Sequence, residues 1–211
     1  MRLPCLDSRL QAAYDFVLPD SIHADVASDH GLLPLRLVVD GKCPRVIVSD
    51  INAAALGRAK AAFCKYGYHH QADFVHADGL ECLTEPVQSV SITGLGGDKL
   101  CGILERGAAL LRGAPLILSP HSRLYTARRG IYAAGYHITQ EKLVRSRGRY
   151  YIMMFAEEGA SRCDESGLWL GPCLIHDRRP LCHEYLLWRE KVAVSSGGED
   201  LPYIKEALSC W

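Results

Sequence analysis

The sequence predicts an α/β fold in which a mostly parallel sheet is followed by a short helical appendage. Between residues 6 and 135, strand-like and helix-like segments alternate about five times. Such alternation is typical of parallel strands joined by right-handed crossovers, with helices on both faces of the sheet. After Gly135 two strand-like segments surround an Arg-Gly-Arg turn, which predicts an antiparallel hairpin at the end of the sheet.

Each element of the alternating region carries a local signal. The expected strands, rich in β-branched residues, are 22–26, 45–50, 72–78, 89–93 and 115–119. The expected helices, with apolar residues at helical spacing, are 6–17, 32–40, 53–66, 99–111 and a last one that runs to Gly135. Pro19 ends the first helix, Gly41 the second and Gly67 the third, while Asn52 and Ser122 are the expected caps of the third and the last.

The C-terminal part has a different composition. The hairpin is expected over residues 136–158, and residues 159–170 are a linker of Ser, Gly and charged residues. Residues 171–211 are expected to form a loop and one or two helices, the first over 181–194. The length of 211 residues therefore suits one domain over residues 1–158 and an appendage over residues 159–211.

Composition restricts the function classes. No stretch approaches the roughly 20 apolar residues that cross a bilayer, and no secretory signal is visible at the N-terminus. The nine cysteines are scattered without a CxxC pair, which favours reduced thiols and a cytoplasmic location. A formal net charge of zero is unusual for a nucleic-acid-binding protein, so binding to RNA would need a local basic patch.

No metal site is expected. Cys173 and His176 have a ligand-like spacing, but the next candidates, Cys182 and His183, are adjacent in sequence. An adjacent pair has poor geometry for two ligands of one zinc ion. The sequence leaves the oligomeric state open.

Polar residues follow every predicted parallel strand, at the edge where such sheets bind ligands. Asp50 ends the second strand, where a carboxylate can accept both hydroxyls of a ribose. Asp78 follows the third strand and can bond an exocyclic amine such as that of adenine. The glycine-rich run 93–97 after the fourth strand either exposes bare backbone to a ligand or makes a tight bend into the next helix.

The sequence of the loop after the first strand distinguishes between two possible nucleotide cofactors. A dinucleotide site needs G-x-G-x-x-G so that a pyrophosphate rests on a helix N-terminus. Here the loop reads ADVASDHG, with Ala27 at the first glycine position. Asp25 and Asp29 would repel a pyrophosphate but suit the amine and sulfonium of S-adenosylmethionine. The loop therefore disfavours a nicotinamide oxidoreductase.

These motifs resemble a known family. ADVASDHGLLP, VIVSDIN, ADGLECL, ITGLGGDKL, PLILSPHS and GRYYIMMFAEEG occur in the order and at about the spacing of the bacterial tRNA (adenine-N1)-methyltransferases that act at position 22, the TrmK family. The resemblance spans residues 6–176. It implies a class I, Rossmann-like methyltransferase fold with a seven-stranded sheet. It also implies S-adenosylmethionine as cofactor and tRNA as partner.

The resemblance assigns site residues. It places Asp25, Ala27 and Asp29 beside the methionine part of the cofactor, Asp50 beside the ribose, and Asp78 with Gly79 beside the adenine. The full set expected to bind the cofactor is Asp25, Ala27, Ser28, Asp29, His30, Asp50, Ile51, Asn52, Asp78, Gly79, Thr93 and Gly94. Asp29 is also the expected catalytic group, which would accept a hydrogen bond from the exocyclic amine of the target adenine, with His30 as the second candidate.

Contacts with RNA are expected in the second half of the chain. A target base inside folded RNA has to be extruded and stacked on a flat side chain, for which Tyr125, Tyr150 and Tyr151 are equal candidates. A strip of cations is expected to bind phosphates. Its members are Arg123, Arg128, Arg129, Lys142, Arg145, Arg147 and Arg149.

Two features depart from the family pattern. Ala27 replaces a glycine, and only residues 171–211 follow the linker, where the family has a longer coiled-coil region. Two alternatives to a tRNA methyltransferase therefore stay open at this point: a methyltransferase for a small molecule, and a non-catalytic paralogue that binds cofactor or RNA.

Overall fold

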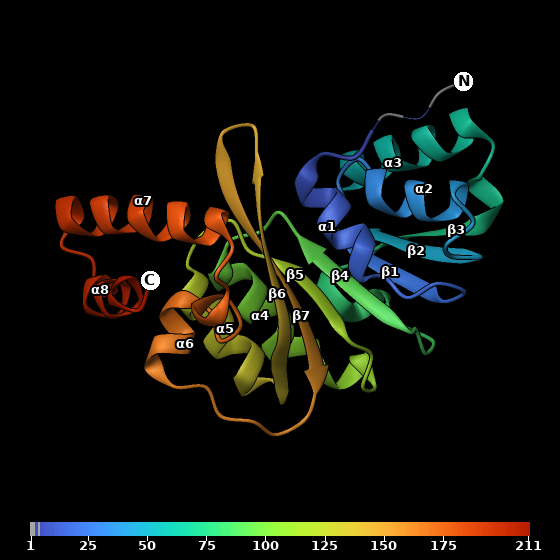
Figure 1. The fold of residues 1–211 in the computed structure, drawn as a ribbon. Coiled ribbons are helices and arrows are strands. Elements are labelled where there is room, and N and C mark those ends of the chain that lie inside the picture. The colour runs from blue at the N-terminus through green and yellow to red at the C-terminus, as the bar shows by residue number, and fades with distance from the viewer. Residues whose placement is uncertain (1–2, 4) are drawn as a thin grey trace.

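The described part of the computed structural model, residue 3 and residues 5–211, contains seven strands in one sheet of order β3-β2-β1-β4-β5-β7-β6 (Figure 1). The first five strands are parallel, and β7 runs antiparallel between β5 and β6. The strands are β1 Ile22–Val26, β2 Arg45–Asp50, β3 Ala72–His76, β4 Ser89–Thr93, β5 Leu116–Ser119, β6 Tyr136–Ser146 and β7 Arg149–Glu158. The predicted fold class is confirmed.

Helices cover both faces of the sheet (Figure 1). One face packs against α1 Ser8–Phe16, α2 Leu32–Val39 and α3 Ala53–Tyr66, and the other against α4 Gly97–Gly107 and α5 Leu124–Ala133. The pleat of β5 shows the division, because Ile117 joins the first core while Leu116 and Leu118 join the second.

Two of the expected helix boundaries are confirmed and one is wrong. Asn52 caps α3 by accepting from the backbone N–H of Ala54, and Gly67 ends that helix in a left-handed conformation. Ser122 does not cap α5. Arg123 takes the position before this helix with φ 54° and makes no side-chain cap, while the Ser122 carbonyl accepts from the Gly97 N–H.

The segment expected as a linker contains a helix, α6 Glu165–Leu170. Asp164 caps it by accepting from the Gly167 N–H at 2.8 Å, and Leu168 and Leu170 are buried. The correction has a simple cause: one turn of helix with a glycine inside has too little apolar pattern to be recognised. The chain then continues into α7 Pro180–Ser196 and α8 Leu201–Ser209, which form a small core of their own with α6.

A buried ion pair joins this C-terminal region to the sheet. Arg128 of α5 and Glu141 of β6 are both fully buried, with 3.0 Å between Nη2 and Oε1. Arg128 Nη1 also donates to the carbonyls of Leu168 and Trp169, and Glu141 Oε2 accepts from the Cys173 N–H. The assignment of Arg128 to an RNA-binding strip is therefore wrong, since no RNA can reach it.

Arg128→Met tests the structural role of this pair. The substitution leaves the Glu141 carboxylate buried without its cation, and we expect it to lower the free energy of unfolding by about 3–5 kcal/mol in urea titrations. Arg145→Met is the matched control, because Arg145 pairs with Glu184 at the surface and its loss costs less than about 1 kcal/mol. Equal, small losses in both variants would contradict the role.

Candidate functional site

The candidate site lies where the strand order of the sheet reverses. β1 pairs with β2 on one side and with β4 on the other, and the two crossovers leave in opposite directions. Two cavities of about 440 and 450 Å³ open at the carboxyl ends of these strands. Because Ala27, Ile51 and Leu95 line both cavities, the two form one continuous cleft.

All twelve residues expected to bind the cofactor line this cleft. The first cavity is lined by Asp25, Ala27, Ser28, Asp29, His30, Asp50, Ile51, Asn52, Thr93 and Gly94. Asp78 and Gly79 line the second cavity. The rule that ligands bind at the carboxyl ends of parallel strands thus brings together residues from four separate segments.

Asp25 is the buried acid at the end of β1. Its carboxylate accepts from the hydroxyls of Ser28 and Ser91, both at 2.5 Å. Burial raises the pKa of Asp25 to about 6, although the two hydrogen bonds act in the opposite direction. A cationic group that enters the first cavity would compensate this buried charge.

A chain of hydrogen bonds continues behind Asp25. Ser91 donates its one hydroxyl proton to Asp25, so it accepts from His23 Nε2 at 2.8 Å. His23 Nδ1 is then the acceptor for the Ser89 hydroxyl at 2.7 Å. Burial lowers the pKa of His23 to about 3, which keeps the ring neutral, and the bond to Ser91 fixes the tautomer with the proton on Nε2.

Asp50 ends β2 with both carboxylate oxygens bonded to the backbone. Oδ2 accepts from the Asp29 N–H at 3.0 Å and Oδ1 from the Asn52 N–H at 2.8 Å. These bonds hold the loop after β1 against the loop after β2. Each oxygen keeps a second lone pair, which suits a vicinal diol such as that of a ribose.

The carboxylate of Asp29 is already paired within the protein, whereas the predicted catalytic role requires it to accept a hydrogen bond from the substrate. Its Oδ1 lies 2.6 Å from Arg58 Nη2 of α3, and its Oδ2 lies 3.4 Å from His30 Nε2. The carboxylate therefore pairs with a cation on its own side of the cleft.

The loop after β1 contains two left-handed residues that are not glycine, Ala27 with φ 57° and Asp29 with φ 49°. Asp tolerates this conformation, whereas Ala does so only at a cost. Gly31, also left-handed, is needed for packing as well, since a Cβ there would lie 2.9 Å from the Ala59 Cβ. The glycine at the Ala27 position of the family pattern is thus replaced at a site where glycine is the favoured residue.

The second cavity is apolar at its entrance and charged at its rim. Ile51 is 65% exposed although it is a large apolar residue, so a flat ligand in the cleft would cover it. Asp78 pairs with Arg106 across 3.0 Å at the rim. Gly79 is left-handed, and a Cβ there would lie 3.0 Å from Ile103.

The glycine run after β4 serves mainly as a tight bend. A Cβ on Gly97 would lie 2.3 Å from the carbonyl oxygen of Arg123, so only glycine lets α4 start beside the loop after β5. Gly94 differs, because it faces the first cavity with φ 86° close to Arg9 and His121.

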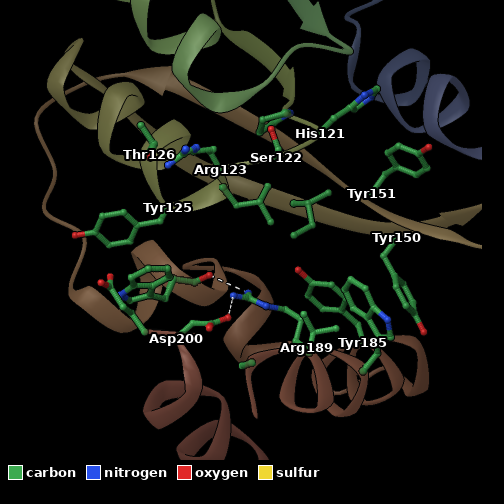
Figure 2. A pocket seen from close by; sticks show the side chains of 18 of the residues that line it. His121, Ser122, Arg123, Tyr125, Thr126, Tyr150, Tyr151, Tyr185, Arg189 and Asp200 are labelled. Carbon is green, nitrogen blue, oxygen red and sulfur yellow. Dashed lines mark hydrogen bonds and ion pairs between the residues drawn. The ribbon is translucent and has the colours of Figure 1, made fainter. Parts of the chain in front are cut away.

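A third cavity of about 510 Å³ lies between α5, β7 and α7 and adjoins the cleft (Figure 2). His121 lines both this cavity and the first one, so it marks their junction. The aromatic residues of the third cavity are Tyr125, Tyr150, Tyr151, Trp169, Tyr185 and Trp188. All three tyrosines that the sequence offers for base stacking therefore gather in one place.

The predicted strip of cations is divided by the sheet. Lys142 and Arg145 of β6 lie on opposite faces, because Lys142 pairs with Asp15 of α1 and Arg145 with Glu184 of α7. Arg123 pairs with Asp98, and Arg129 lies over the ring of Tyr125. Arg147 and Arg149 lie at the hairpin turn. A single continuous strip of the seven residues is thus not formed.

Sequence reasoning missed several residues of the site. His23 and Ser91 lie inside predicted buried strands, where a polar residue on a core face is itself a signal of a hydrogen-bond network. His121 was not missed as a polar residue, because the strand-end rule includes it after the fifth strand, but its place at the junction of two cavities has no sequence signal. Arg9 and Arg58 come from helices, and nothing in the sequence marks which face of a helix points at a cleft.

No group of three or more His, Cys, Asp or Glu side chains is arranged to hold a metal ion in the part of the chain described. Within the same residues, no helix is long and apolar enough to span a bilayer.

Known proteins are similar to this chain in sequence and in fold. The family model described as "Methyltransferase domain" matches residues 6–154. The tRNA (adenine(22)-N(1))-methyltransferase of Bacillus subtilis is 28% identical over 181 residues, which cover 82% of this chain and 76% of that protein.

Solved structures extend the likeness to the C-terminal helices. Streptococcus pneumoniae Sp1610 in complex with S-adenosyl-L-methionine is 25% identical with a TM-score of 0.91, over 97% of this chain and 100% of that one. The TrmK structure from B. subtilis has a TM-score of 0.87 at 23% identity, over 98% of this chain and 100% of that one. The chain belongs to the methyltransferase-domain family, and its predicted resemblance to the TrmK tRNA (adenine-N1)-methyltransferases is confirmed.

Proposed function

We propose that this protein transfers a methyl group from S-adenosylmethionine to N1 of an adenosine in tRNA, as the name of its B. subtilis relative states for that protein. The observation that carries the proposal is the cleft at the switch point of the sheet. It places the buried acid Asp25 and the strand-end acid Asp50 in one cavity, and it adjoins an aromatic cavity large enough for part of an RNA.

The residues of the cleft fit this cofactor. Asp25 is a buried carboxylate that lacks a cationic partner within hydrogen-bond distance among the described residues, and it suits the ammonium group of the methionine part. Asp50 suits the ribose hydroxyls, and exposed Ile51 with Leu95 and Gly79 suits the flat adenine. When bound, S-adenosylmethionine supplies an electrophilic methyl carbon on a sulfonium.

The chain's own contribution is positioning. Adenine N1 carries a lone pair, so its methylation needs no strong base, and most of the rate gain comes from holding the acceptor in line and excluding water. The acceptor has to enter past Gly94 and His121, which border the first cavity on the side of the aromatic cavity. The methylated base carries a positive charge, which nearby carboxylates and aromatic faces stabilise.

The role of Asp29 as the acceptor for the exocyclic amine stays a prediction. Its carboxylate would first have to leave Arg58, 2.6 Å away. Without that change, the N–H of Asp29 still contributes to the site through its bond to Asp50.

Transfer of labelled methyl groups to unmodified tRNA transcripts tests the proposed function. We expect N1-methyladenosine after nuclease digestion, and at least about a tenfold loss of cofactor affinity in Asp50→Ala. Asp73→Ala is the matched control, since Asp73 also lies in a strand of the sheet but pairs with Arg45 outside the cleft. Methylation of a small molecule but of no tRNA would replace the proposal by the small-molecule alternative. Cofactor binding without any transfer would favour a non-catalytic paralogue.

Cofactor affinity should depend on pH through Asp25. Its pKa of about 6 in the free protein means that the carboxyl loses its charge below that pH and no longer attracts an ammonium group. We therefore expect the dissociation constant, measured by calorimetry, to be flat above pH 7 and to rise by up to about tenfold per pH unit below 6. In Asp25→Asn the constant should be high at all pH values, and a pH dependence that persists in this variant would contradict the role of Asp25.

Ala27→Gly should stabilise the protein. The left-handed backbone of Ala27 costs about 1 kcal/mol relative to glycine, and the greater freedom of glycine in the unfolded chain offsets part of the gain. We expect the free energy of unfolding to rise by about 0.5 kcal/mol and cofactor affinity to stay equal or increase. A marked loss of either quantity would show that the Ala27 methyl group makes a favourable contact.

A further inference from the structure

Three of the four tyrosines that line the aromatic cavity are the candidates for base stacking, and each has different neighbours. In Figure 2, Tyr125 lies on one side of the cavity, Tyr151 with His121 on another, and Tyr150 with Tyr185 beside α7. Only rings near His121 lie at the junction with the cofactor cleft. A base that stacks elsewhere in the cavity would be farther from the reacting groups.

Two of the tyrosines are held by structural contacts. Tyr125 packs on Trp169 with 4.3 Å between ring centroids, and its hydroxyl donates to Glu165. Tyr150 packs against Tyr185 and Trp188, with centroids 5.2 and 5.3 Å away. Its hydroxyl donates to Glu184 at 2.8 Å. Tyr125 therefore attaches α6 to α5, and Tyr150 attaches α7 to β7.

Tyr151 has different neighbours. The His121 ring meets it edge-on with 5.3 Å between centroids, and the Arg9 guanidinium lies 5.8 Å from the centroid of the tyrosine ring. Arg9 Nη1 lies 3.2 Å from His121 Nε2. Arg9 and His121 also line the first cavity of the cleft, together with Gly94 at the end of β4. Among the three candidate tyrosines, Tyr151 is thus the one whose ring contacts within the described residues are made with residues that line the cofactor cleft.

The protonation of this cluster follows from its geometry. Arginine only donates, so His121 Nε2 accepts and the ring is neutral. Burial and the charges of Arg9 and Arg149 lower the pKa of His121, in agreement with a neutral ring. Among the described residues, Arg9 of α1 is the cation that lies over the face of Tyr151, and it does not line the aromatic cavity.

We propose that Tyr151 is the stacking surface for the target adenine, and that Arg9 holds the place of this base over the ring until the RNA binds. This inference rests on the proposed function and names the substrate contact of the same site. Formation of the N1–methyl bond breaks the sulfur–methyl bond and moves the positive charge from sulfur to the purine ring. A tyrosine face that already attracts the Arg9 guanidinium is suited to a base that becomes cationic.

Four variants test the proposal: Tyr151→Phe, Tyr151→Leu, Tyr151→Ala and, as a matched control at the end of α3, Tyr66→Ala. We expect kcat/KM for tRNA to stay within about threefold of wild type in Tyr151→Phe and Tyr66→Ala. It should fall about 10- to 100-fold in Tyr151→Leu and Tyr151→Ala, because a base stacked on an aromatic ring loses an interaction of this size. Cofactor affinity and melting temperature should be unchanged in Tyr151→Leu, which keeps most of the apolar volume.

A spectroscopic readout separates stacking from a structural effect. In tRNA that carries 2-aminopurine at the methylated position, we expect the fluorescence of the extruded base to be quenched by wild type and by Tyr151→Phe. With Tyr151→Leu the fluorescence should be bright. Equal quenching and equal kcat/KM in Phe and Leu variants would overturn the proposal while methylation by wild type continued. If wild type bound cofactor but methylated no tRNA, the proposed function itself would fail, and the inference with it.

Discussion

The buried ion pair between Arg128 and Glu141 is the constraint on which the arrangement of both parts of the molecule depends. A fully buried charge is tolerated only when its polar atoms are satisfied, and here the partners come from the segment around α6. That segment must therefore fold against α5 and β6 before the pair is stable. Residues 171–179 connect this segment to α7, so the pair also anchors the chain that leads into the helix beside the aromatic cavity.

The cofactor cleft uses the opposite solution for a buried acid. Asp25 forms no ion pair among the described residues, although the charge of Arg9 lowers its pKa. It is held by neutral hydroxyls, which are ordered in turn by the neutral ring of His23. The network orients the carboxylate without neutralising it, so the charge remains available to a ligand. The raised pKa of Asp25 is the electrostatic sign of a site that is incomplete without a cation. Structural and ligand-binding charges can thus be distinguished in this fold by whether the protein supplies the counter-ion.

The strands and the strand-end acids were predictable because β-branched runs and parallel-sheet topology leave few alternatives. Helix α6 was not, since Gly167 and one turn of length give no periodicity. The error at Arg128 was avoidable in principle: Leu124, Arg128 and Ile131 share one stripe of α5, so a cation there signals a buried partner. The division of the other cations depends on the register of β6, and the pairing of Asp29 with Arg58 depends on a loop geometry. Neither is encoded in a local pattern.

Several cations of this neutral chain are already paired with acids, which affects how the protein can bind RNA. Lys142, Arg145 and Arg123 each lie beside an acid from another element, so these cations already serve tertiary contacts. Exposed ion pairs of this kind contribute little to the stability of the fold. A phosphate of an RNA can therefore take the place of the carboxylate with a small net change in free energy. Phosphate contacts made in this way give modest affinity, because part of each gain offsets a lost ion pair. Discrimination between the correct RNA and other RNAs then has to come from uncharged contacts. The fold provides such contacts in the aromatic cavity, which meets the cleft at His121.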